Sequence, residues 1–188
     1  MIIFSSCPRR EEGVKIHSSR RFCMRLFVMG VVLSAVGSAS AAAQGLIAQK
    51  ALSYEMAQAI VQGTVERCRA DGFSVSVSVI DASGLLKAFV RDDGINGPHT
   101  IDLSRRKAYT ALTFASRWAT SLEAAKAWGH ALGSPMPNVE GTTGLGGGVP
   151  IKVGDVPIGA VGVSGAVGGD KDENCAKAGI AKIAHLLK

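Results

Sequence analysis

A histidine and a short basic run lie close together near the middle of the chain. His99 follows the loop sequence Asn96-Gly97-Pro98, and Arg105, Arg106 and Lys107 follow within the next predicted helix. A neutral imidazole is a common ligand of transition metals, and guanidinium and ammonium groups bind carboxylates. The pattern indicates a site for a metal-containing or acidic small molecule. The alternative is a surface histidine beside a solvated helix face, with the basic run paired to nearby acids.

Catalytic motifs of the common hydrolase and metal-enzyme classes do not appear in the sequence. Ser164 lies in Gly-Val-Ser-Gly-Ala, which departs from the Gly-x-Ser-x-Gly nucleophile pattern at its last position. The chain has no His-Glu-x-x-His motif and no cysteine pair at zinc spacing. The glycines of 144–148 lead into a predicted strand, whereas a phosphate-binding loop follows a strand and opens a helix. We therefore assign no catalytic residue, and whether the protein is an enzyme stays open.

A second run of glycines marks the last predicted hairpin. Gly159, Gly162 and Gly165 recur at every third position. Glycine in a strand lets another backbone, a helix or a flat ligand approach closely. We expect something planar, or another chain, to lie against this strand.

Several other side chains permit two interpretations. The hydroxyl of Thr110 has either the backbone four residues earlier or a ligand as its partner. Trp118, Trp128 and His130 form either a flat apolar wall or an ordinary packed helix face. His185, near the end of the chain, is expected on the surface.

The first forty-odd residues have the order of a secretory signal peptide. A cationic patch at 20–25 precedes an apolar run at 26–37 and small residues at 38–44. We expect a leader over 1–43, with the signal peptide at about 24–43, and one domain over 44–188. The apolar run is shorter than the roughly 20 residues of a spanning helix, so we expect no stable membrane anchor. The sequence distinguishes neither Met1 from Met24 as the start nor Sec from twin-arginine export.

The high net charge is largely a property of the leader. The whole chain has 21 basic and 15 acidic residues, of which the leader carries six basic and two acidic ones. The remainder is close to neutral, which argues against a nucleic-acid partner. We expect a periplasmic or secreted protein. Cys68 and Cys175 follow the leader, and both a disulfide and two buried thiols are open for them.

Periodicity predicts one α+β domain in the order α-β-β-α-α-β-β-α. Two strand pairs read as hairpins, so the sheet should be antiparallel with helices packed on it. Thr100 or Asp102 is the expected N-cap of the helix that follows the first hairpin. The expected helices cover 53–70, 100–114, 121–133 and 170–187, and the expected strands cover 73–80, 85–90, 149–153 and 156–164.

Five motifs in this order resemble the GlcG/HbpS family, also called the haem-degrading or DUF336 family. They are Asp81-Ala-Ser-Gly84, Arg91-Asp-Asp-Gly94, Arg106-Lys-Ala-Tyr-Thr-Ala111, Gly146-Gly-Gly-Val-Pro-Ile151 and Ile158-Gly-Ala-Val-Gly-Val-Ser-Gly165, with Asp170 beyond them. The resemblance covers about residues 50–185. It implies a profilin-like antiparallel sheet, homo-oligomers from dimer to octamer and, for some members, binding or slow degradation of haem or interaction with a corrinoid.

The resemblance implies an exported protein that binds haem, a small-molecule tetrapyrrole. His99 would then contact the haem iron, with Arg106 or Lys107 near the propionates. The expected cofactor-binding residues are His99, Arg106, Lys107, Thr110, Gly146, Gly147 and Gly148. Two alternatives stay open. One is an accessory protein or enzyme acting on a small organic acid or a corrinoid, and the other is an oligomeric structural module without a ligand.

Overall fold

The computed structural model describes residues 45, 47–95, 97–127 and 139–188. The chain divides into units of residues 1–47 and 48–188, and every described helix and strand lies in the second unit. The predicted leader, Trp128 and His130 lie outside the described residues. None of the helices within the described ranges is both long and apolar enough to cross a membrane.

The predicted α+β class and element order are confirmed. The elements are α2 (Tyr54–Ala70), β1 (Ser76–Asp81), β2 (Leu86–Arg91), α3 (His99–Thr113), α4 (Ser121–Ala127), β3 (Gly148–Val153), β4 (Val156–Ser164), α5 (Gly169–Ala181) and a short 3₁₀ helix (Ala184–Leu186). Ser53 caps α2 as predicted, because its hydroxyl accepts the Met56 N–H at 3.2 Å.

The four strands form one antiparallel sheet in the order β2-β1-β4-β3. The two predicted hairpins, β1–β2 and β3–β4, are both present. Gly154 turns the second hairpin with φ +60°, a conformation that glycine adopts without strain. The hairpins join through β1 and β4, so the strands that are most distant in sequence lie at the centre of the sheet.

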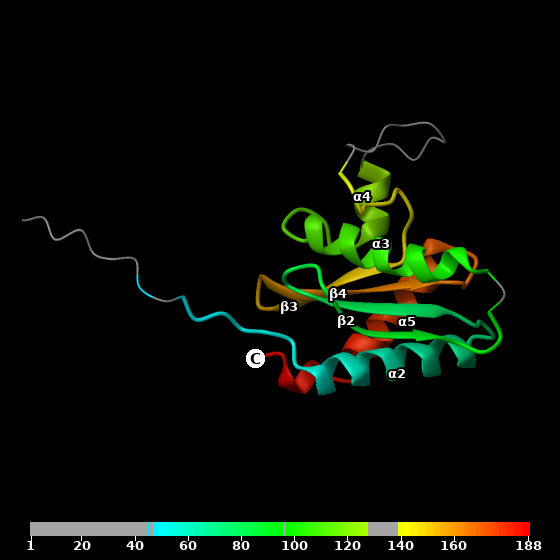
Figure 1. Ribbon diagram of the computed structural model, residues 1–188, viewed down its shortest axis with the longest axis horizontal. Coiled ribbons are helices and arrows are strands. Elements are labelled where there is room, and N and C mark those ends of the chain that lie inside the picture. Colours follow the sequence, from blue (N-terminus) through cyan, green and yellow to red (C-terminus); the bar gives the residue numbers. More distant parts are fainter. Residues whose placement is uncertain (1–44, 46, 96, 128–138) are drawn as a thin grey trace, which may run out of the picture. The chain divides into compact units, whose positions relative to one another are not determined.

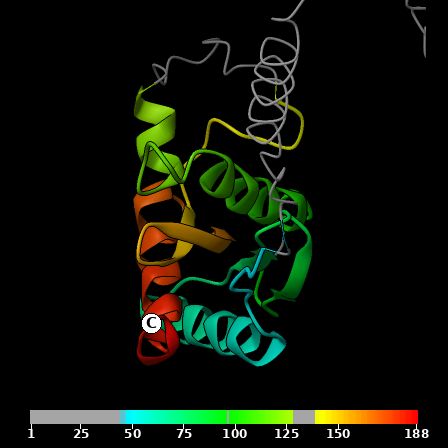
Figure 2. The same cartoon turned by 90° about the vertical axis from the view of Figure 1, so that its left-hand side faces the viewer.

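Helices cover both faces of the sheet (Figure 1). Helices α2 and α5 pack on one face, where Val77, Val79 and Val161 are fully buried against them. Helix α3 covers the other face, over β4, β1 and β3. Figure 2 shows the sheet between α2 and α3, with α5 alongside it.

The serine face of β1 is closely packed rather than exposed. The Ser76 hydroxyl lies 3.0 Å from that of Thr100, and the Ser78 hydroxyl lies 2.8 Å from that of Ser104. These bonds satisfy buried polar groups on both sides of the contact between β1 and α3.

Close packing against other parts of the protein accounts for the glycines at 148, 159 and 162. A Cβ at Gly162 would collide with the Ser104 carbonyl and the backbone of Ala108, and a Cβ at Gly148 would collide with the Lys107 carbonyl. Gly159 instead faces the Ile80 carbonyl of the neighbouring strand β1. At Gly148 and Gly162 the absent side chains let the α3 backbone lie directly on the sheet, which corrects the expectation of a planar ligand against Gly159 and Gly162.

Two predicted helix ends differ in the structure, and a third lies outside the described residues. Helix α3 begins at His99, with Pro98 rather than Thr100 or Asp102 at its N-cap and no side-chain cap hydrogen bond. The φ of Pro98, −61°, is fixed by its ring and suits the start of a helix. The last helix stops at Ala181 instead of continuing to 187, and a 3₁₀ turn follows. Helix α4 is described to Ala127, so its predicted end near 133 lies outside the described residues.

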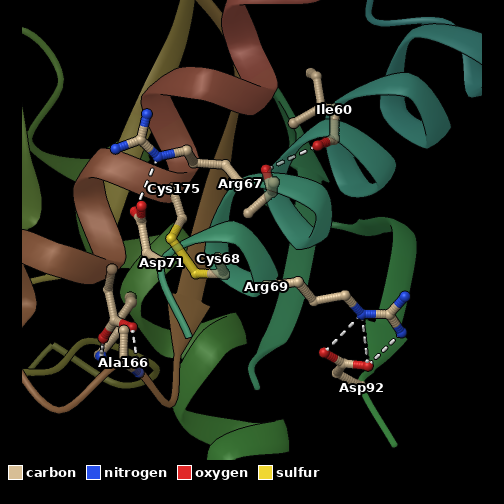
Figure 3. Close-up of a disulfide and its surroundings, with 11 residues drawn as sticks. Ile60, Arg67, Cys68, Arg69, Asp71, Asp92, Ala166 and Cys175 are labelled. Atoms are coloured by element: carbon tan, nitrogen blue, oxygen red, sulfur yellow. Dashed lines mark hydrogen bonds and ion pairs between the residues drawn. A yellow bond between two sulfur atoms is a disulfide. The ribbon is translucent and has the colours of Figure 1, made fainter. Parts of the chain in front are cut away.

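A disulfide joins α2 to α5 (Figure 3). Cys68 and Cys175 have Cα atoms 5.4 Å apart, and both residues are fully buried. The structure therefore selects the bridge over two free thiols. The bridge also fixes α5 three residues beyond Asp172.

Candidate ligand pocket

A cavity of about 520 Å³ opens where β4 ends and α5 begins. This volume is within the usual range for small-molecule sites. Its lining comes from α3 and the loop before it, from the first turn of α5 and the loop after β4, from Leu122 of α4, and from the segment before β3. The apolar part of the lining consists of Ile95, Leu122, Leu145 and Val167.

Glycine backbone forms one wall of the cavity. A Cβ at Gly169 would lie 2.7 Å from the Cα of Gly146, and a Cβ at Gly146 would lie 2.8 Å from the Cβ of Leu122. The segment before β3 and the start of α5 therefore touch backbone to backbone. Gly165 and Gly168 continue this wall, which presents main chain rather than side chains to the cavity.

A buried ion pair lies in the cavity lining. The Lys107 Nζ donates to the Asp172 Oδ2 at 2.6 Å, and the two side chains are 5% and 3% exposed. The other Asp172 oxygen accepts the Ala166 N–H at 3.0 Å. Burial raises the pKa of Asp172, although the Lys107 ammonium acts in the opposite direction. The pair holds α3, α5 and the loop after β4 together.

Glu173 makes a second set of connections from the same turn of α5. Its Oε1 accepts the Leu122 N–H at 2.9 Å and the Gly147 N–H at 3.4 Å. Burial raises the pKa of Glu173, opposed by these backbone hydrogen bonds. Asp172 and Glu173 together connect α3, α4 and the glycine segment to α5.

Three of the predicted site residues line the cavity. His99 is exposed at the first position of α3, Lys107 is the cation of the buried ion pair, and Gly146 belongs to the glycine wall. The structure brings these three together around one space. Their binding of a ligand stays a prediction.

The other predicted site residues do not line this cavity. Arg106 donates to the Thr142 carbonyl at 2.7 Å and lies 4.0 Å from Asp102. Thr110 donates to the Arg106 carbonyl at 2.8 Å, which confirms the backbone interpretation of its hydroxyl. Gly147 and Gly148 pack against Lys107 beneath the glycine wall.

The donor set around His99 limits what kind of metal site this is. No group of three His, Cys, Asp or Glu side chains within the described residues is arranged to hold a metal ion. Among the described residues that line the cavity, His99 is the one histidine. A metal held here would have to bring most of its ligands with it, as the iron of a porphyrin does.

Comparison with known proteins assigns the family. The family described as Haem degrading protein HbpS-like matches residues 52–181. The chain belongs to this HbpS-like family. No curated protein sequence matches this chain significantly.

Solved structures agree with the HbpS-like assignment. A double mutant of Streptomyces reticuli HbpS is 36% identical, with a TM-score of 0.67 over 79% of this chain and 99% of that one. Klebsiella pneumoniae protein ORFY is 23% identical, with a TM-score of 0.65 over 75% and 97%. PduOC in a complex with heme is 24% identical, with a TM-score of 0.61 over 72% and 96%. The last two likenesses show the fold alone.

Sequence reasoning missed the two buried acids of this HbpS-like domain. Asp172 and Glu173 are read most simply as first-turn acids that complement the helix dipole. A better signal is the spacing of Asp172, Cys175, Ala176 and Gly179, which places an acid on the buried face of α5. An acid on an apolar helix face requires a buried partner, here Lys107.

Proposed function

We propose that this HbpS-like protein binds haem, or a closely related tetrapyrrole, in the cavity between α3 and α5. The observation that carries the proposal is the position of His99, an exposed imidazole on the lining of a 520 Å³ cavity with a glycine-backbone wall. A flat ring suits a flat surface, and a histidine imidazole is one of the side chains that hold haem iron in proteins.

The residues present fit a porphyrin. The ring supplies four nitrogen ligands, which suits a site whose described lining contains one histidine, His99. Apolar side chains of Ile95, Leu122 and Leu145 are available to the faces of the ring. The Lys107 ammonium offers an electrostatic attraction to propionates, which its pairing with Asp172 moderates.

Slow oxidative loss of the bound haem is the activity that we propose to follow from binding. Bound haem would supply an iron that reacts with oxygen or peroxide, and the cavity residues would hold and orient the ring. The support is the family description, which names haem degradation, and the heme complex of PduOC, a protein of similar fold.

We further propose that the protein is exported and forms homo-oligomers. The signal-peptide pattern of the leader supports export, and so does the Cys68–Cys175 disulfide, since disulfides persist in oxidising compartments. The edge strand β2 supports self-association, because Leu86 and Phe89 are 52% and 40% exposed on it.

Hemin titration of the protein without its leader tests the binding proposal. Wild type should shift the Soret band at micromolar hemin, and His99→Ala should weaken hemin binding by about tenfold or more through loss of the iron ligand. His185→Ala is the matched control, because His185 is exposed and does not line the cavity. The absence of a Soret shift in wild type would contradict haem binding. An unchanged shift in His99→Ala would contradict only the ligand assignment.

A small organic acid is the second candidate ligand, favoured by the Lys107 ammonium in the cavity lining. The two candidates predict different stabilisation. Glycolate-like acids should raise the melting temperature if an acid is the ligand, whereas hemin should do so if a tetrapyrrole is.

A further inference from the structure

Val167 has a backbone conformation that valine rarely adopts. Its φ is +46°, in the left-handed region, and every other positive-φ residue in the described ranges is a glycine. For a β-branched side chain this conformation is a true outlier, because Cβ crowds the neighbouring carbonyl. The neighbouring residues 165 and 168 also have positive φ, +141° and +144°, and both are glycine, the residue type that adopts such angles without strain.

Packing of the Val167 side chain does not explain the strain, because this side chain is 87% exposed. The strain is imposed by the backbone around it. Ala166 is fully buried and donates its N–H to Asp172, while the Asp172 N–H bonds the Gly168 carbonyl at 3.1 Å. Since Asp172 is also held by Lys107, the loop is fixed on both sides of Val167.

The isopropyl group of Val167 is thus placed in the lining of the cavity at a cost that glycine would avoid. Leu145, also in the lining, is 46% exposed. The apolar side chains of Val167 and Leu145 are therefore both solvent-exposed at the cavity. Strained residues of this kind cluster at ligand clamps. Their exposed apolar surface gains most when an apolar ligand covers it.

We propose that Val167 is a ligand-contact residue that packs on the apolar plane of the bound ring and thereby favours flat aromatic ligands. This inference rests on the proposed function. It assigns the recognition of the ring to Val167 and leaves recognition of the iron to His99. Its consequence is a trade-off in which the same residue lowers the stability of the free protein and raises its affinity for the ligand.

The variant Val167→Gly separates these two effects. The melting temperature of the free protein should rise by about 2–6 °C, because glycine adopts this conformation without strain. The affinities for hemin and for metal-free protoporphyrin IX should both fall by about 5- to 20-fold, because the lost contact is with the ring. His99→Ala should weaken hemin binding and leave protoporphyrin IX binding nearly unchanged.

Two further variants control the interpretation. Val167→Ala keeps a Cβ but loses the β-branch and most of the contact, so affinity should fall and the melting temperature should rise by less than in Val167→Gly. Val156→Ala changes another exposed valine, 59% exposed at the start of β4 and outside the cavity lining, so both readouts should match wild type.

Equal ring affinity of Val167→Gly and wild type would overturn the inference, as would a Val167→Gly variant that melts lower than wild type. A change of oligomeric state in Val167→Gly by size-exclusion chromatography, with ring affinity retained, would also overturn it and assign Val167 to a contact between copies. Failure of wild type to bind either ring is a different result, because it removes the proposed function itself.

Discussion

Replacing Lys107 by methionine should lower the free energy of unfolding by about 3–5 kcal/mol. The substitution keeps the length of the side chain but leaves the Asp172 carboxylate, 3% exposed, without its cation. An unpaired buried charge is among the most destabilising consequences of a single substitution. Urea unfolding at pH 7, followed by circular dichroism, measures the change.

A double-mutant cycle isolates the contribution of the Lys107–Asp172 pair. Asp172→Asn retains an oxygen that can accept the Ala166 N–H. Lys107→Met combined with Asp172→Asn should therefore destabilise the fold by clearly less than the sum of the single substitutions. Arg67→Met is the control, because it breaks the exposed Arg67–Asp71 pair and should have a small effect. Additive single effects would show that the two side chains do not interact.

Removal of the disulfide by Cys68→Ala with Cys175→Ala should lower the free energy of unfolding by about 2–5 kcal/mol. The bridge closes a loop across a sequence separation of 107, which strongly restricts the unfolded chain. The melting temperature of the protein without its leader should fall by roughly 8–20 °C. Thermal melting followed by circular dichroism measures the difference between the variant and the oxidised wild type.

The double cysteine variant also provides its own control for reductant. A thiol reductant should lower the melting temperature of wild type towards that of the variant, and it should leave the variant unchanged. Because both cysteines are fully buried, reduction of the disulfide should require unfolding of the protein or prolonged incubation with the reductant. Two thiols titrating in denaturant without reductant would contradict the disulfide.

Local patterns were sufficient to predict the elements of this fold. The alternating valines and serines of 74–79 specify a strand with two distinct faces, and Gly154-Asp155 specifies a tight turn. The pairing of β1 with β4 is a long-range contact, and the hairpin pattern alone does not determine it. The same limit applies to the glycines of β4, whose pattern indicates a close approach without indicating that α3 is what approaches.

The candidate site was predicted in part, for a related reason. His99 and Gly146 carry visible signals, a loop histidine and a glycine run. Asp172 and Val167 carry weak ones, because the partner of Asp172 is 65 residues away and the conformation of Val167 is set by tertiary hydrogen bonds. Features that arise from assembly of the whole fold are not encoded in any short segment.

A crystal structure of the protein without its leader in complex with hemin tests the central claim most directly. We predict that the ring lies in the cavity between α3 and α5, with the His99 imidazole on the iron and the Val167 side chain against the ring. A hemin bound elsewhere, such as the groove between α2 and β2 lined by Tyr54, Arg69 and Lys87, would contradict the assignment of the cavity.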